Sequence, residues 1–201
     1  MSKSFVQLAK KAERGSSSIA ISKEPTEKPD LNIHTLGNKV LRQSAKRISK
    51  VDNSTRDLIK QMLHSMYSAK GIGLAAPQVG IHKELLVIDL DIEDSATPPI
   101  VLINPEITDF SASVETYEEG CLSIPGVYLN VIRPSSIKVK FRDEMGRPKK
   151  LNADGLLARC IQHEMDHLNG ILFVDRVSNK NDLNKELQEK GFKSEDVISI
   201  A

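Results

Sequence analysis

The chain has 201 residues, of which 39% are hydrophobic and 27% are charged, a composition typical of one globular domain with tails. Its formal net charge of +1 gives no field of one sign, so neither nucleic acid nor a membrane surface is expected as a partner. Two cysteines, Cys121 and Cys160, are too few for a disulfide framework. No apolar run approaches the roughly 18 residues of a membrane helix. These features favour a cytoplasmic protein.

Residues 1–30 differ in composition from the rest of the chain. They contain a run of three serines and a polar stretch broken by Pro25 and Pro29. Such a segment buries too little apolar surface to offset its ordering entropy, so we expect a mobile, disordered N-terminal tail. Because residues 1–22 are rich in serine and basic residues, an organellar protein with a transit peptide is a minor alternative.

The globular pattern begins at Leu31, and its first clear element is a helix over residues 53–69. Apolar residues recur there at helical spacing, and Asn53 or Ser54 is the expected N-terminal cap. Glycines end this helix, and a loop rich in small residues continues as far as Gly80.

Four strands are expected after this loop, because short apolar or alternating runs stand between turn residues. They cover residues 84–90, 100–103, 114–117 and 137–141. A helix over residues 155–168 follows, capped by Asp154 and stopped by Gly170, and a short polar helix covers about residues 181–190. Strands in a run, with helices mainly before and after them, favour an α+β fold with antiparallel pairing.

The strongest local pattern is His163-Glu164-Met165-Asp166-His167, within the helix expected at 155–168. Residues four apart lie on one helix face, so the two imidazoles can bind one cation. Glu164 is rotated from His163 by about 100°, where it can accept a proton from water without being a ligand. Chance histidines on a solvated face are the alternative, but the helical context favours a metal site.

A catalytic site of this type has three protein ligands and one open position. Cys121 is the best third candidate, because it ends a strand and follows Gly120, which lets the backbone approach a bound group. Its thiolate would be a soft, anionic ligand. Taken alone, a cysteine is more often buried and structural, and we expect that role for Cys160. Cys160 lies one turn before His163 and forms with Leu156 a stripe that belongs to a pocket wall or to the core.

The loop of residues 71–80 carries a third signal. Gln78 is its one polar side chain among small and apolar residues, and its amide could donate to a developing oxyanion. By itself, this segment is only a turn-rich loop.

Together, the segments GIGLAAPQVG, EGCLS and QHEMDH resemble peptide deformylase, in the same order and over about residues 31–178. The resemblance implies antiparallel β-sheets surrounding a central helix that carries the HExxH motif. It also implies removal of the formyl group from the N-terminal formylmethionine of newly made polypeptides, with Fe²⁺ as the usual cation and Zn²⁺, Ni²⁺ or Co²⁺ able to substitute. The chain then divides into a tail (1–30), a catalytic domain (31–178) and a short polar C-terminal helix and tail (179–201).

The same resemblance implies the roles of individual residues. The metal ligands would be Cys121, His163 and His167, with Glu164 as the acid/base. The Gln78 amide and the Leu122 backbone N–H would stabilise the oxyanion. Ile72, Gly73, Glu119 and Gly120 would line or hold the substrate, and we expect the methionine side chain to rest among Ile72, Tyr117, Leu156 and Cys160. Tyr117 and Tyr128 resemble the aromatic rim of bacterial and organellar members.

Two other classes remain open. An HExxH zinc peptidase would cut internal peptide bonds, although its third ligand is usually His or Glu rather than an upstream Cys. A non-enzymatic module would hold its metal with four protein ligands, and His64 or His82 could supply the fourth.

The expected partners are N-formylmethionyl nascent peptides. Some members dock on the ribosome through a basic C-terminal helix, but residues 179–201 hold four lysines and five acidic residues, which makes docking by charge doubtful.

Overall fold

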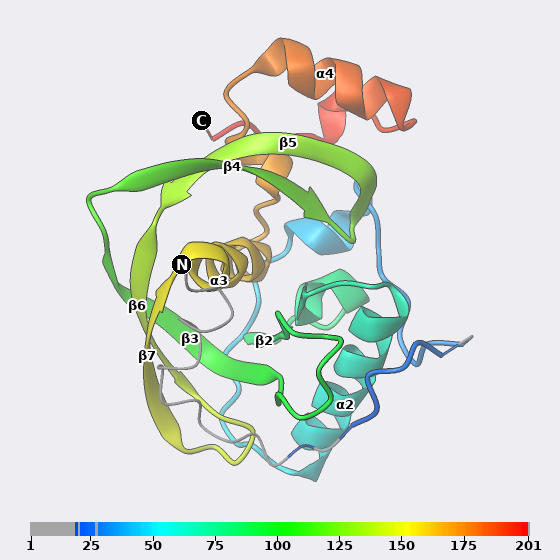
Figure 1. Ribbon diagram of the computed structural model, residues 1–201. Helices are drawn as coiled ribbons and strands as arrows, with labels where there is room; N and C mark the ends of the chain where they lie inside the picture. Colours follow the sequence, from blue (N-terminus) through cyan, green and yellow to red (C-terminus); the bar gives the residue numbers. More distant parts are fainter. Residues whose placement is uncertain (1–18, 20, 27, 201) are drawn as a thin grey trace.

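The computed structural model describes residues 19, 21–26 and 28–200 (Figure 1). Its α-helices are α2 (Asn53–Ser68), α3 (Gly155–Leu168) and α4 (Lys180–Glu189). Its strands are β1 (Gly73–Ala75), β2 (Leu85–Ile88), β3 (Ile100–Phe110), β4 (Val114–Cys121), β5 (Ile124–Pro134), β6 (Ser136–Arg142) and β7 (Pro148–Asp154). Four short 3₁₀ helices complete the described elements: η1 (Lys39–Arg42), η2 (Ala76–Val79), η3 (Phe173–Arg176) and η4 (Ser194–Asp196).

The strands form two antiparallel sheets around α3. One sheet has five strands in the order β1-β2-β3-β6-β7, and the other is a ribbon of β4 and β5. Helix α3 packs against strands of both sheets and lies between them in Figure 1. The expected α+β fold is therefore confirmed. The sequence patterns missed β1, β5 and β7, whereas the helices at 53–69, 155–168 and 181–190 agree with α2, α3 and α4 to within a residue at each end.

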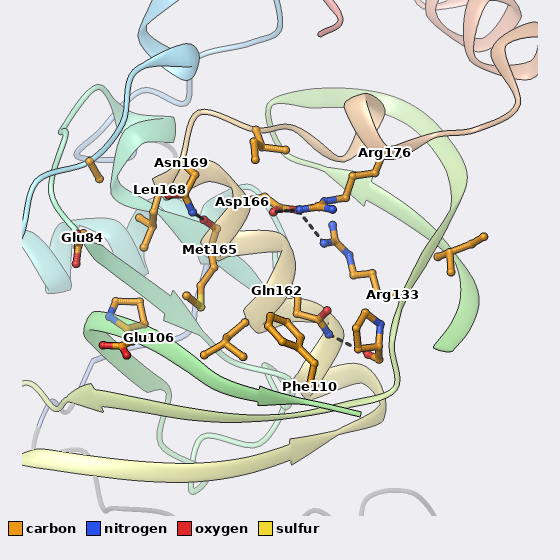
Figure 2. A pocket seen from close by; sticks show the side chains of 16 residues that line it. Glu84, Glu106, Phe110, Arg133, Gln162, Met165, Asp166, Leu168, Asn169 and Arg176 are labelled. Carbon is orange, nitrogen blue, oxygen red and sulfur yellow. Dashed lines mark hydrogen bonds and ion pairs between the residues drawn. The ribbon is translucent and has the colours of Figure 1, made fainter. Parts of the chain in front are cut away.

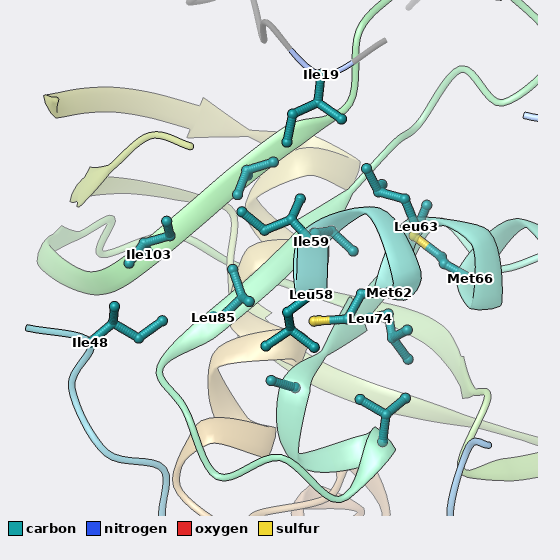
Figure 3. Packing of buried hydrophobic residues seen from close by; sticks show 14 of the residues in the cluster. Ile19, Ile48, Leu58, Ile59, Met62, Leu63, Met66, Leu74, Leu85 and Ile103 are labelled. Carbon is teal, nitrogen blue, oxygen red and sulfur yellow. The ribbon is translucent and has the colours of Figure 1, made fainter. Parts of the chain in front are cut away.

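The sequence of strand β2 is a continuous apolar run because both faces of the strand are buried. Leu85 and Val87 point into the cluster formed with α2, whereas Leu86 and Ile88 point into the cluster formed with α3. All four side chains are fully buried, because helices cover both faces of the sheet at this point. Figure 3 shows the α2 cluster, where Met62 and Met66 fill the space beside Leu74. This packing fixes β1 and β2 between the two helices.

The C-terminal helix α4 covers the outer side of the ribbon. Its Leu183 and Leu187 are buried in a third cluster together with Val127 and Leu129 of β5. The remaining face of α4 is exposed and polar. No helix in the described part of the chain is long and apolar enough to span a membrane.

Three local expectations need correction. The cap of α2 is Asp52, whose side chain accepts a hydrogen bond from the Thr55 N–H, rather than Asn53 or Ser54. Asp154 stands at the start of α3 but makes no capping hydrogen bond. Residues 114–117 form a strand that is not half-buried, since the start of β4 is exposed on both faces.

Part of the expected N-terminal tail packs against the folded domain, which its composition did not indicate. Ile19 is only 7% exposed and belongs to the α2 cluster, and the Lys23 side chain forms a buried ion pair with Asp89. The expectation of a mobile tail is therefore wrong for Ile19 and residues 21–26. Its remaining positions up to residue 20, and residue 27, lie outside the described residues.

Candidate metal centre

Three side chains, one from β4 and two from α3, converge near η2. Cys121 ends β4, and His163 and His167 lie one turn apart on α3. One donor atom from each lies within 4.8 Å of the others, close enough for a single cation to bind all three. The Cys121 Sγ and the His167 Nε2 are 3.3 Å apart. The donor set of one thiolate and two imidazoles suits a transition metal such as iron, zinc, nickel or cobalt.

His163 is oriented by a carboxylate on its far side. Its Nδ1 lies 2.9 Å from the Oε2 of Glu119, so Nε2 remains for a cation. Burial lowers the pKa of His163, but the hydrogen bonds of Cys121 and Glu119 raise it well above its usual value. A proton and a cation therefore compete for this ring, and metal binding must release the proton.

The pKa of His167 differs from that of His163, because burial is the main cause of its shift. Burial lowers the pKa of His167 well below its usual value, which keeps the imidazole neutral, the form that binds metals. Its Nδ1 is buried without a hydrogen-bond partner among the described residues. The other ring nitrogen, Nε2, is the one that faces the Cys121 sulfur, so Nε2 is the atom available to a cation.

Glu164 is buried beside these ligands. It is 4% exposed, and its Oε2 has no hydrogen-bond partner among the described residues. Burial raises the pKa of Glu164 to about 7, with the charges of His163 and Glu119 acting in opposite directions. A side-chain carbon added at Gly73 would lie 2.5 Å from the Glu164 Oε1. The absence of a side chain at Gly73 thus makes room for a carboxylate poised to exchange protons near pH 7.

The Gln78 side chain is held beside Cys121 by hydrogen bonds with neighbouring residues. Its Oε1 accepts a hydrogen bond from the Ala75 N–H at 2.8 Å, which directs Nε2 toward the Ser123 Oγ at 3.1 Å and the Cys121 Sγ at 3.5 Å. The Leu122 backbone lies in the two-residue turn between β4 and β5, outside the strand pairing. The Gln78 amide thus contacts the Cys121 sulfur, and Leu122 follows Cys121 directly in the chain. Ser123, which is fully buried, was not expected from the sequence.

A pocket of about 530 Å³ opens over this centre. Every expected site residue except His167 lines it, as does Tyr128 of the expected aromatic rim, together with residues that were not expected, among them Lys70 and Arg159. Ile72, Tyr117 and Leu156 form exposed apolar walls, with 36%, 61% and 51% of each residue accessible. Cys160 lies deeper at 6% exposure, with its Sγ 3.9 Å from the Ile72 carbonyl oxygen. A side-chain carbon added at Gly120 would lie 2.5 Å from the Tyr128 ring.

Glu119 lines the pocket but is itself held by several hydrogen bonds. It is 6% exposed, and both of its carboxylate oxygens accept hydrogen bonds from Arg133, at 2.6 and 2.9 Å. Arg159 donates to the same carboxylate at 2.7 Å. Since the carboxylate also contacts His163, its two oxygens are shared among Arg133, Arg159 and His163, and it orients the His163 ring.

The charged network behind α3 was not predicted either. Arg133 joins Glu119 to Asp166, donating to the Asp166 carboxylate at 2.7 Å, and Arg176 binds the same carboxylate through two contacts of 2.6 Å. Figure 2 shows both guanidinium groups converging on Asp166. Alternation along β5 was the available signal, because Arg133 is in phase with the buried residues Val127, Leu129 and Val131.

The network borders a second pocket, which Figure 2 shows and which neither His163 nor His167 lines. Its volume of about 670 Å³ exceeds that of the first pocket. Its wall includes Gln162, Met165 and Asn169, and its carboxylates do not join a metal-binding cluster within the described residues. Size alone does not make it the reaction site.

No fourth metal ligand joins the centre among the described residues. His64 lies 3.1 Å from Asp30, and His82 lies 3.1 Å from the Val40 carbonyl oxygen, so both suggested candidates bind elsewhere. The three donors therefore leave a coordination position open, which is typical of catalytic rather than structural sites.

An HExxH helix enclosed by antiparallel sheets, with a cysteine as third donor and a buried glutamate beside it, defines a class of metal-dependent hydrolases. The family model described as polypeptide deformylase matches residues 30–182. A peptide deformylase of Prochlorococcus marinus is 74% identical over 200 residues, covering 100% of this chain and 98% of that protein. The chain belongs to the polypeptide deformylase family, and its activity is the metal-dependent removal of the formyl group from the N-terminus of newly made polypeptides.

Solved structures agree with this assignment. The crystal structure of a peptide deformylase from Synechococcus elongatus in complex with actinonin has a TM-score of 0.90 and 58% identity, and covers 91% of this chain and 100% of that one. The peptide deformylase of Thermotoga maritima has a TM-score of 0.69 and 40% identity, with coverages of 74% and 97%. The peptidase and the non-enzymatic module are not favoured by these findings.

Proposed function

We propose that Cys121, His163 and His167 hold one Fe²⁺ ion and that Glu164 is the acid/base of the deformylase reaction. The observation that carries this proposal is the convergence of three donor atoms within 4.8 Å beside a buried carboxylate. Ni²⁺, Co²⁺ or Zn²⁺ would suit the same donors, because ligand softness admits all of them and metal supply decides which one is loaded.

When bound, the ion lowers the pKa of water and polarises the formyl carbonyl. Glu164 accepts the proton of the attacking water on its unpaired Oε2 and returns it to the leaving amine. A carboxyl with a pKa of about 7 can do both, since it gives up and takes back a proton near neutral pH.

We further propose that Gln78 and Leu122 receive the developing oxyanion. The Gln78 amide is fixed by its bond to the Ala75 N–H, so its N–H groups are preorganised and need no reorientation during the reaction. The Leu122 N–H belongs to the tight turn after Cys121 and makes no bond in the strand pairing. Two donors aimed at one position stabilise the tetrahedral intermediate more than the planar substrate.

The substrate methionine would occupy the apolar walls made by Ile72, Tyr117, Leu156 and Cys160. An unbranched thioether fits an apolar slot of irregular shape, whereas a charged side chain would lose its hydration without gaining a partner. Strand β1 stands at the edge of the large sheet, where an extended peptide can add main-chain hydrogen bonds. Gly73 and Gly120 then admit the peptide backbone close to the centre.

Anaerobic purification followed by metal analysis and a deformylation assay tests these assignments. We expect about one iron per chain and turnover of a formyl-Met tripeptide, with no cleavage of casein. The iron form should lose activity in air faster than the nickel form, because a ferrous ion and a thiolate at an open site both react with oxygen. Casein cleavage, or equal lifetimes of the two forms in air, would contradict the proposal.

We propose that the protein acts in the cytoplasm, where its nascent-chain substrates are made and where a free catalytic thiolate stays reduced.

We propose that any contact with the ribosome is transient and independent of charge, since residues 179–201 carry a net charge of −1 from four lysines and five acidic residues. Cosedimentation with ribosomes should then be weak and insensitive to salt. Strong binding that falls steeply with salt would argue for an electrostatic dock.

A further inference from the structure

The Lys23 ammonium group lies in a cradle of four oxygen atoms. Its Nζ is 2.6 Å from the Asp89 Oδ2 and donates to the backbone carbonyls of Asp91, Asp94 and Thr97 at 2.8, 2.9 and 2.7 Å. The Lys23 and Asp89 side chains are 8% and 1% exposed. A lysine placed in this way is a structural cation: it neutralises a buried carboxylate and gathers the carbonyls of the loop that follows β2.

The segment that carries Lys23 is fixed on both sides of it. Ile19 packs into the α2 cluster, as Figure 3 shows, and is 7% exposed. The Thr26 N–H donates to the Ser68 hydroxyl at the end of α2, at 3.1 Å. The segment therefore crosses the end of α2 and reaches the loop of residues 91–97, which lies nearly seventy residues away in the sequence.

Asp89 connects this cradle to the wall of the reaction pocket. Its backbone N–H donates to the Ile72 carbonyl oxygen at 2.8 Å, and the Tyr67 hydroxyl donates to its Oδ2 at 2.8 Å. The next pair along the strands is Gly73 with Ile88. Asp89 thus holds the residues between α2 and β1 from two sides, and these are the residues that line one side of the pocket.

We propose that Lys23 is a positioning residue for the formylated substrate, acting through Asp89 on the Ile72–Gly73 wall. This inference rests on the deformylase activity and on the pocket described above. With Lys23 in place, the Asp89 carboxylate is neutralised and its backbone stays in register with Ile72. Without it, a buried charge is left unpaired and the wall is free to shift.

The metal ligands depend on a different set of contacts. His163 is held by Glu119, which is in turn held by Arg133 and Arg159, and none of these residues contacts the Lys23 segment in the described interactions. Loss of Lys23 is therefore expected to weaken substrate binding while leaving the metal and the proton transfer of Glu164 in place.

The test compares Lys23→Met with Lys28→Met in the full-length, metal-loaded enzyme. Lys28 is an exposed lysine five residues further on and is the matched control. We expect Lys23→Met to raise the KM for a formyl-Met tripeptide about fivefold, within the range of remote coupling effects. Its kcat and metal content should stay within about twofold of wild type, and hydrogen exchange over residues 70–75 should be faster. Lys28→Met should match wild type in every measurement.

An unchanged KM in Lys23→Met, or a parallel loss of kcat and metal, would overturn the proposal. If Lys23→Met does not fold, the double variant Lys23→Met/Asp89→Asn removes both charges of the pair. It should fold because no charge is left unpaired, and it should keep the raised KM because no ammonium group gathers the carbonyls of the loop beside Asp89. A wild-type KM in the double variant would overturn the proposal as well. A wild-type enzyme that is inactive on formyl-Met peptides when fully loaded with metal would instead contradict the proposed function.

Discussion

Glu119 and His163 are joined by a contact of 2.9 Å between the carboxylate Oε2 and the ring Nδ1. This contact commits one ring nitrogen and leaves the other for a cation, and Arg133 prevents the carboxylate from turning away. Glu119 follows Glu118 directly on β4, yet its neighbour is exposed whereas Glu119 is buried. The position of one glutamate therefore controls the orientation of His163, a proposed metal ligand.

Glu119→Gln should weaken metal binding by about 10- to 100-fold, the usual effect of removing a carboxylate that orients a ligating histidine. Competition with a metallochromic chelator measures the change. Glu118→Gln is the matched control, since its exposed side chain should leave the affinity unchanged. Wild-type affinity in Glu119→Gln would show that Arg133 and the helix alone orient His163.

The same carboxylate predicts how stability depends on pH. Burial alone would raise the pKa of Glu119, but hydrogen bonds from Arg133 and His163 more than offset it and hold the pKa well below its usual value of 4.5. A depressed pKa in the folded state stabilises the protein above pH 4.5, and this stabilisation is lost as the pH falls further. Urea unfolding of the metal-free protein should therefore show a falling midpoint below about pH 4.5, and Glu119→Gln should show a shallower fall. Parallel curves would disprove the assignment.

Cys121→Ala should lose both metal and activity, because two imidazoles alone hold a divalent ion weakly. Cys160→Ala is the natural control, since Cys160 is also close to the pocket but is not among the three converging donors. Elemental analysis after anaerobic purification compares the two variants. Full occupancy in Cys121→Ala would remove this residue from the ligand set.

Glu164→Ala should retain its metal but turn over at least about 10²-fold more slowly, a typical contribution of a general acid/base. Near-wild-type turnover in a metal-replete sample would exclude Glu164 from the reaction.

The pH profile gives a separate test of Glu164. Because burial raises its pKa to about 7 and only the carboxylate accepts a proton, kcat/KM should fall as the pH drops. A bound cation favours the carboxylate, so the acidic limb should lie at or below pH 7. The residual activity of Glu164→Ala should lack this limb.

Substrate choice should depend on the space around the carbonyl. An acetyl group places a methyl where the formyl group has hydrogen, and that methyl would crowd Gly120 and Leu122. A displacement near 1 Å can cost about 10²-fold in rate. Formyl-Met peptides should therefore exceed both acetyl-Met and formyl-Asp peptides in kcat/KM. Comparable rates for acetyl-Met and formyl-Met on one metal-loaded preparation would leave only a general amidase.

The helix that carries the histidines was predictable because its signals are local. Helical periodicity, the histidine spacing and the glycine after Leu168 all fall within one short stretch of sequence. Strand β1 was not predictable, since three residues carry no periodicity and its partner β2 holds it in place. The convergence of Cys121 with His163 and His167 was predictable only in combination with other motifs, because the two histidines lie more than forty residues away in the sequence.

The N-terminal segment shows the limit of composition as a guide. Polar residues and prolines indicated a mobile tail, and that expectation is wrong for Ile19 and Lys23. One isoleucine and one lysine give no pattern in the sequence, yet each finds a complementary site on the folded domain. Deleting residues 1–30 should therefore lower the melting temperature.

The arrangement of donors on two elements gives a bound ion a second effect. Cys121 ends a strand and His163 lies on a helix roughly 40 residues later, so an ion bound to both closes a loop in the chain much as a disulfide does. An unfolded chain does not hold the three donors together, so the ion binds only the folded protein. The free energy of metal binding therefore adds to the free energy of unfolding. Metal supply would then set the lifetime of the enzyme as well as its rate, since chains that lack the ion open more readily to proteases.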